Sequence, residues 1–201
     1  MFQLFKDPQT QLKKEISRKL VHLSSLWLVY ALFYFDKTSC LWLFSGAMLI
    51  TVLFETIKTS THIKLLNPIR SMLREHEKKN LTGAFYVLLA ALLVVAFCSK
   101  YVAILSLLIM LLSDSVASLV GRAWGRVPIL EKTLEGSMAF FIITLLILIM
   151  GCTQRWIHAS WAQLSIIAFL ITIVELFSRR LFLDDNLTIT ASCAILLSHI
   201  S

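Results

Sequence analysis

The sequence predicts an all-α, polytopic membrane helix bundle of about seven transmembrane helices, with the N-terminus in the cytoplasm. Composition, the spacing of apolar runs and the distribution of basic residues support this prediction. Of the 201 residues, 58% are hydrophobic and 15% are charged, whereas soluble globular chains have about 45–50% apolar and about 25% charged residues. The mean hydropathy is +0.79. This composition excludes a soluble domain, a disordered chain and a collagen-like chain.

Seven apolar runs bounded by charged residues make up most of the chain. A helix needs about 20 residues to cross a bilayer core of ~30 Å, and about 17 is the usual lower limit. The first run and the last two are therefore short, and the last is compatible with a re-entrant segment or with packing inside the bundle. In chain order, the runs are 20–35, 40–56, 81–98, 101–121, 137–152, 161–177 and 187–201.

The basic residues fall on one side of the membrane if the seven runs alternate in direction. With a cytoplasmic N-terminus, all but three of the 19 Lys and Arg residues lie in the cytoplasm, and the exceptions are Lys37, Lys100 and Arg155. Short loops with such a bias orient a membrane protein. Topology thus explains the net charge of +7, and no nucleic-acid partner is expected. The expected location is the inner membrane of a bacterium or the endoplasmic reticulum of a eukaryote.

A single integral membrane domain is expected over residues 1–201, with two cytoplasmic segments outside the spans. Residues 1–19 form a polar, basic N-terminal segment without the pattern of a cleavable signal peptide. Residues 57–80 form the longest cytoplasmic connection. Asn67 and Pro68 in this connection are typical of a helix start, and apolar residues follow at helical spacing, so we expect an interfacial amphipathic helix there.

Three acidic residues, Glu55, Asp114 and Glu175, lie inside apolar runs. Because an ionisable group costs about 2.5–3.5 kcal/mol at the centre of a membrane helix, each is a functional candidate. The expected topology places all three toward the cytoplasmic ends of their helices. This one-sided arrangement suits an enzyme that takes one substrate from the cytoplasm and a lipid from the bilayer, whereas a transporter tends to place such groups near the midplane.

The densest group of candidates lies in segment 113–137, which we expect to bind a nucleotide and a metal ion. In its first part a small residue recurs at every fourth position, a pattern that allows close helix packing. These small residues are Ser113, Ala117, Gly121 and Gly125. A neighbouring stripe contains Asp114, Ser118 and Arg122. A structural alternative for Asp114 is neutralisation by a buried arginine or a hydrogen bond to another helix.

The second part of this segment, 131–137, immediately precedes the fifth apolar run. Gly136 and Ser137 at the start of a helix leave backbone N–H groups free, which together with the helix dipole favour phosphate oxygens. Lys132 supplies a point charge. Together with the acid and the Gly-Arg pairs upstream, this string predicts a phosphate and metal site.

The order of these motifs resembles the nucleotide-binding core of the CTP-dependent lipid kinase family, which includes dolichol kinase, phytol kinase and yeast-type diacylglycerol kinase. The core motifs are Asp114, Ala117-Ser118, Gly121-Arg122, Gly125-Arg126 and Lys132-Thr133-x-Glu135-Gly136-Ser137. The flanking motifs are Arg18-Lys19-x-x-His22, Leu81-Thr82-Gly83-Ala84, Glu175 and Asp184-Asp185-Asn186-Leu187-Thr188-Ile189. The match runs through most of the chain, as in a short member restricted to the family core.

The resemblance implies transfer of the γ-phosphate of CTP, or less readily of ATP, to the hydroxyl of a lipid alcohol such as a polyprenol, phytol or diacylglycerol. Asp114, Lys132 and Glu135 would be catalytic, and Asp114, Asp184 and Asp185 would hold Mg²⁺. The implied nucleotide-binding residues are Ser118, Gly121, Arg122, Gly125, Arg126, Lys132, Thr133, Gly136 and Ser137. Further candidates are Arg18, Lys19, His22, Glu55, Glu175 and Asn186.

Two other functions remain open from the sequence. Phosphatidate cytidylyltransferases have a similar core, but their characteristic C-terminal motif, with basic pairs, a Gly-rich His turn and paired aspartates, is absent here. Asp184 and Asp185 are compatible with a remnant of that acidic pair. A non-enzymatic membrane scaffold is the second alternative. The chain has neither a P-loop nor a protein-kinase signature, so the common nucleotide-binding folds are not expected.

Overall fold

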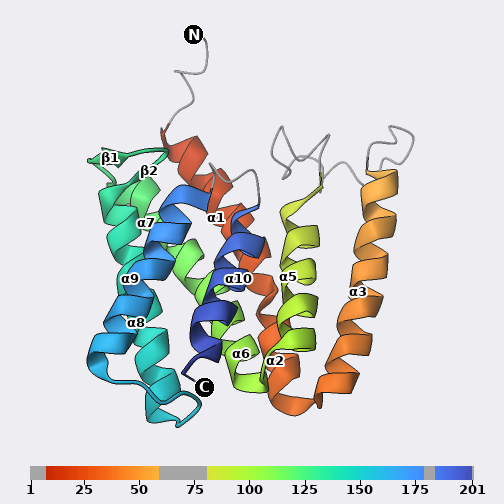
Figure 1. The fold of residues 1–201 in the computed structure, drawn as a ribbon. Coiled ribbons are helices and arrows are strands. Elements are labelled where there is room, and N and C mark those ends of the chain that lie inside the picture. The colour runs from red at the N-terminus through yellow and green to blue at the C-terminus, as the bar shows by residue number, and fades with distance from the viewer. Residues whose placement is uncertain (1–7, 59–80, 179–183, 201) are drawn as a thin grey trace.

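The computed structural model describes residues 8–58, 81–178 and 184–200, and these residues are almost entirely helical (Figure 1). The helices are α1 (Pro8–Ser24), α2 (Leu26–Tyr34), α3 (Lys37–Ile57), α5 (Gly83–Phe97), α6 (Lys100–Leu108), α7 (Asp114–Trp124), α8 (Leu134–Thr153), α9 (Trp161–Phe177) and α10 (Asp185–Ser198). A π-helical turn, Ile109–Ser113, joins α6 to α7. A short antiparallel ribbon of β1 (Pro128–Ile129) and β2 (Lys132–Thr133) connects α7 to α8. The all-α prediction is confirmed, and the ribbon is an addition to it.

The chain runs back and forth between two ends of the bundle. In Figure 1 the β1–β2 ribbon, the start of α1 and the ends of α3 and α9 lie at the upper end, and the α2–α3, α5–α6 and α8–α9 connections lie at the lower end. Three described helices are long and apolar enough to cross a membrane, namely Lys37–Ile57, the continuous helix Lys100–Trp124, and Leu134–Thr153. Helices α5 and α9 are apolar but shorter. The number of seven spans and the cytoplasmic N-terminus stay predictions.

The first predicted run, 20–35, is divided between two helices rather than forming one. The helix is interrupted at Ser25, whose backbone N–H donates to the carbonyl of His22 at 3.0 Å. The Ser24 hydroxyl donates to the Val21 carbonyl at 2.6 Å, and such local side-chain bonds compete with regular helical hydrogen bonding. The amphipathic helix expected in 57–80 cannot be compared, because residues 59–80 lie outside the described part of the chain.

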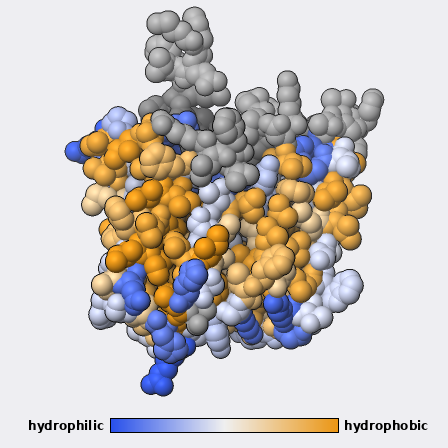
Figure 2. Space-filling view, in the orientation of Figure 1, coloured by the Kyte–Doolittle hydropathy of each residue, from blue (hydrophilic) through white to orange (hydrophobic). Residues whose placement is uncertain are grey.

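The core is built around α6 and the π-helical turn. Ile104, Leu105, Leu107 and Met110 are fully buried there, and α2, α5, α8 and α10 pack against this central helix. By contrast, α3 exposes most of its apolar side chains. In the face drawn in Figure 2, apolar residues cover the side of the bundle, and hydrophilic residues lie toward its lower and upper ends. This distribution fits helices that contact lipid around a packed centre.

Candidate active site

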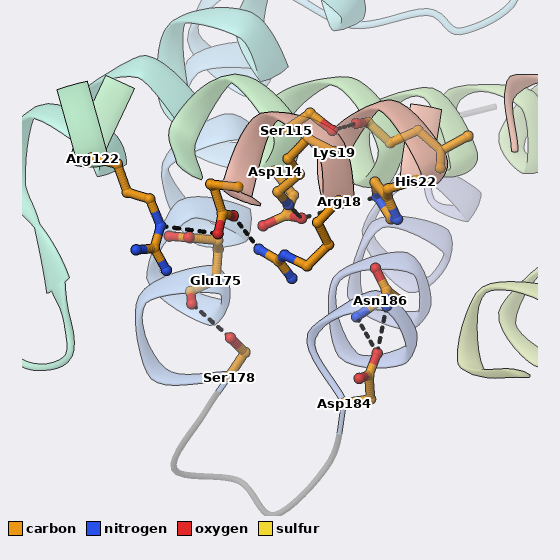
Figure 3. Close-up of polar contacts among 12 residues, drawn as sticks. Arg18, Lys19, His22, Asp114, Ser115, Arg122, Glu175, Ser178, Asp184 and Asn186 are labelled. Carbon is orange, nitrogen blue, oxygen red and sulfur yellow. Dashed lines mark hydrogen bonds and ion pairs between the residues drawn. The ribbon is translucent and has the colours of Figure 1, made fainter. Parts of the chain in front are cut away.

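The predicted site residues of α1 meet Asp114 at the start of α7. The Lys19 ammonium donates a short, charge-assisted hydrogen bond to Asp114 Oδ2, and the two side chains are only 5% and 11% exposed. His22 Nε2 lies 4.0 Å from the same carboxylate oxygen and is buried without a hydrogen-bond partner among the described residues. The sequence placed these residues on the same side of the membrane, and the structure shows that they are in contact (Figure 3).

The π-helical turn determines the direction in which Asp114 points. Asp114 is the first residue after the turn Ile109–Ser113, and a π-helical turn shifts the following residues relative to a regular helix. Ser115, beside Asp114, donates its hydroxyl proton to the Leu111 carbonyl at 2.6 Å. Regular helical spacing does not reveal this turn, so the sequence analysis missed it.

Glu15 is a functional candidate that the sequence analysis missed. Its buried carboxylate accepts hydrogen bonds from Arg18 on α1 and pairs with Arg122 on α7, and the Nε–Oε2 distance to Arg122 is 2.9 Å. The Arg122 side chain is 45% exposed, and the Arg18 side chain is 26% exposed. Glu15 therefore fixes two accessible guanidinium groups from different helices. In the sequence, Glu15 is visible only as an acid three residues before Arg18, and such acid–base pairs are common on helix surfaces.

A second ion pair lies beside the first. Lys132, on β2, approaches the C-terminal end of α9, where its Nζ lies 2.6 Å from Glu175 Oε1 and 2.5 Å from the Glu175 carbonyl. Ser178 Oγ lies 3.4 Å from the same ammonium. The second carboxylate oxygen of Glu175 is buried without a hydrogen-bond partner in the described part of the chain. Asp114 interacts electrostatically with Lys132 and Glu175, so the two pairs form one charged cluster.

The glycines predicted to bind the nucleotide hold α7 against α8. A Cβ at Gly136 would lie 2.9 Å from the Ala117 carbonyl oxygen, and a Cβ at Gly125 would lie 2.6 Å from Thr133 Cγ2. Gly121 also lies against Gly136 and Thr133. The expected close packing of the small-residue stripe is therefore confirmed, and nucleotide binding by these glycines stays a prediction.

The N–H of Gly136, which we expected to be free for phosphate, has a partner. It donates to Thr133 Oγ1 at 3.2 Å because threonine caps the start of α8. The hydroxyl oxygen of Ser137 is buried without a hydrogen-bond partner among the residues described. Ser118, also predicted to bind nucleotide, is partly exposed on α7.

Glu135 holds the loop before the ribbon. Its carboxylate accepts hydrogen bonds from the backbone N–H groups of Arg126 and Val127, with an N–O distance of 2.9 Å to Arg126. The Arg126 side chain is exposed. In this arrangement Glu135 orders the connection that carries Lys132, and its predicted direct catalytic role stays a prediction.

Of the two acids at the start of α10, Asp184 and Asp185, the second is linked to the charged cluster. Asp184 caps α10, and its Oδ1 accepts hydrogen bonds from the backbone and side-chain N–H groups of Asn186 at 2.9 and 2.7 Å. Figure 3 shows Asp184 apart from Asp114. Asp185 interacts electrostatically with Glu175. Within the described ranges, no group of three or more His, Cys, Asp or Glu residues lies close enough to hold a metal ion.

Glu55 belongs to a separate cluster. It accepts hydrogen bonds from the backbone N–H and the hydroxyl of Thr82 at 2.9 and 2.5 Å and pairs with Lys58. This cluster joins the end of α3 to the start of α5, which Figure 1 shows on the opposite side of the bundle from the β1–β2 ribbon. The predicted candidate Glu55 is thus not brought to Asp114.

Comparisons with known proteins agree with a distant resemblance to lipid kinases. The chain is 32% identical to an uncharacterized protein of Rickettsia prowazekii over 112 residues, which are 56% of this chain and 55% of that protein. It is 26% identical to probable phytol kinase 1, chloroplastic, of Glycine max over 194 residues, which are 89% of this chain and 64% of the kinase. An uncharacterized protein of Methanocaldococcus jannaschii is 24% identical over 190 residues, covering 92% of this chain and 94% of that protein.

The chain therefore spans less than two thirds of the length of the first two of these relatives. No protein-family model matches the chain, and no solved structure matches it. The similarity to a phytol kinase indicates a distant relationship to lipid kinases and agrees with the apolar helices of a membrane protein.

Proposed function

We propose that this chain is a membrane lipid kinase that transfers the γ-phosphate of CTP to the hydroxyl of a lipid alcohol. The observation that carries the proposal is the charged cluster of Lys19, Asp114, Lys132 and Glu175 inside an otherwise apolar bundle. The similarity to a phytol kinase supports the same chemistry. CTP as the donor rests on the resemblance of segment 113–137 to the family core, and ATP is the alternative donor.

In this proposal, phosphates are bound by Lys132 of the cluster and by two arginines beside it. Arg18 and Arg122 reach the accessible edge of the site, where Glu15 holds both guanidinium groups in place. Lys132 supplies a compact positive charge deeper in the site. Phosphoryl transfer depends mainly on positioning and on stabilising the charge of the transferred group. An arrangement of fixed cations therefore suits this reaction better than it suits covalent catalysis.

In this proposal, His22 receives the proton of the lipid hydroxyl. Its Nε2 has no hydrogen-bond partner among the described residues and lies 4.0 Å from Asp114 Oδ2. A neutral imidazole nitrogen accepts a proton, and a neighbouring carboxylate stabilises the resulting imidazolium.

The acids of the cluster fit a magnesium ion that arrives with the nucleotide. Mg²⁺ in such enzymes is bound by one or two carboxylates together with substrate phosphates and water, so a cage of three protein ligands is not required. Glu175 has a carboxylate oxygen without a partner in the described structure, and its negative charge is repelled by those of Asp114 and Asp185. Asp114 with Glu175 or Asp185 would hold the ion, which offsets phosphate charge when bound. Asp184 is occupied by Asn186 and fits this role less well.

The test is the position of the label in the product. Purified protein is incubated with Mg²⁺, γ-labelled CTP or ATP, and a panel of lipid alcohols. A labelled lipid monophosphate together with CDP is the expected result. Labelled pyrophosphate and a CDP-lipid formed from a phosphorylated lipid would establish a cytidylyltransferase instead. Absence of turnover with every donor and acceptor would favour a scaffold, in which the charged cluster only joins helices.

A further inference from the structure

A groove separate from the charged cluster lies between α2, α3 and α5. It has a volume of about 270 Å³ and is partly open at the surface. The residues that line it are Ser25, Trp27, Leu28, Ala47, Ile50, Thr51, Ala84 and Leu88. Because α3 is long and apolar enough to span a membrane and exposes most of its apolar side chains, the groove opens within the apolar surface of the bundle.

The lining of the groove suits a hydrocarbon chain. It contains no charged residue, and its polar groups are the hydroxyls of Ser25 and Thr51 and the indole N–H of Trp27. Thr51 donates its hydroxyl proton to the Ala47 carbonyl of its own helix at 3.0 Å. A polar ligand would therefore lose its hydration in the groove and gain few compensating hydrogen bonds, whereas an alkyl chain exchanges one apolar environment for another.

Ser25, one of the lining residues, connects the groove to the end of α1, the helix that carries Lys19 and His22. Ser25 lines the groove at the break between α1 and α2, and its N–H donates to the carbonyl of His22 at 3.0 Å. Residues three apart are neighbours on one face of a helix, and His22 Nε2 lies 4.0 Å from Asp114 Oδ2. The Ser25 hydroxyl accepts no capping hydrogen bond from α2. A chain in the groove would thus place a terminal hydroxyl beside Ser25 and His22.

We propose that this groove binds the hydrocarbon chain of the acceptor, a single-chain lipid alcohol, and directs its hydroxyl to His22. The proposal rests on the lipid kinase function proposed above and adds the path by which the acceptor enters from the bilayer. A volume of about 270 Å³ is slightly below the range of about 300–1,000 Å³ for ligand pockets. The groove therefore holds the part of one chain nearest the hydroxyl, and the remainder of that chain lies in the membrane.

The test fills the groove and leaves the charged cluster intact. Ala47→Phe places a ring in the groove, and the matched control is Leu49→Phe on the same helix, where the side chain is 66% exposed and does not line the groove. The full chain is photolysed in lipid nanodiscs with hexadecanol that carries a mid-chain diazirine, and adducts are located by mass spectrometry. This readout does not require kinase activity.

In wild type and Leu49→Phe, we expect adducts on α2, α3 and α5 that unlabelled hexadecanol competes away, and in Ala47→Phe we expect most of them to be lost. With the acceptor found in the kinase assay, Ala47→Phe should raise KM roughly tenfold with little change in kcat, as expected when ground-state binding is removed. Turnover of a short, water-soluble alcohol should be retained, which shows that the variant is folded.

Three results would overturn the groove assignment. These are adducts spread evenly over the apolar surface, an unchanged KM in Ala47→Phe, and a preference of wild type for two-chain diacylglycerol over single-chain alcohols. If wild type phosphorylates no alcohol, the proposed function fails, and the crosslinking result decides the groove by itself. An active kinase with normal KM in Ala47→Phe would leave the function standing and remove the groove.

Discussion

Removing the charge of Asp114 tests whether its contact with Lys19 is catalytic or structural. Both side chains are almost buried, with 5% and 11% exposure, so Asp114→Asn leaves the Lys19 ammonium without its partner. Losing one member of a buried pair costs about 3–5 kcal/mol of folding free energy, whereas replacing both members with neutral residues is often close to neutral. We therefore expect Asp114→Asn and Lys19→Met each to be strongly destabilised and the double variant to recover most of that loss.

Turnover should behave differently from stability. Groups that stabilise the transferring phosphoryl are commonly worth about 10² to 10³ in rate, so the double variant should remain inactive although it folds. The assay combines thermal unfolding in detergent with label transfer per folded protein. Asp36→Asn is the matched control, because Asp36 is exposed at the start of α3 and asparagine caps a helix equally well. A double variant that regains both stability and turnover would refute the catalytic assignment.

Three further predictions follow from the contacts around the cluster. Glu15→Gln should raise KM for the nucleotide several-fold and change kcat little, because it releases two arginines that would bind phosphate; an unchanged KM in steady-state kinetics would contradict this. Gly136→Ala should destabilise the protein by roughly 1–3 kcal/mol in a thermal unfolding assay, because its Cβ would lie 2.9 Å from the Ala117 carbonyl oxygen. The control is Gly46→Ala, whose Cβ would have no atom within 4 Å, and it should be neutral or stabilising in the same assay. A cysteine introduced at Leu130 should react with an impermeant maleimide only from the cytoplasmic side and one at Thr38 only from the opposite side; the reverse pattern would invert the expected topology.

Much of the fold was predictable because composition and apolar spacing act locally. The helices α3, α5, α8 and α9 lie within or close to the apolar runs read from the sequence. The interruption at Ser25 and the π-helical turn before Asp114 were not predictable in this way. Both depend on hydrogen bonds that deviate from the regular helical pattern. A prediction from residue spacing assumes a regular helix, so it cannot detect such deviations.

For the candidate site, the sequence identified most of the charged residues but not their partners. A charge inside an apolar run is visible from the sequence, and its cost in the bilayer marks it as functional. Glu15 lies outside the apolar runs, in the polar part of α1, so nothing distinguished it. Glu55 lies inside a run and was selected by the same rule, yet it pairs with Lys58 and Thr82 on another side of the bundle.

By itself, the sequence determined that this protein is an apolar helical bundle with a few ionisable groups inside its apolar runs. These properties follow from the free energy of each residue in the bilayer or in water, which does not depend on distant contacts. Tertiary structure alone decided that Lys19 pairs with Asp114 and Lys132 with Glu175. These partners are far apart in the chain. Lys19 meets Asp114 because α1 packs against α7, and Lys132 meets Glu175 because the ribbon carries it to the end of α9.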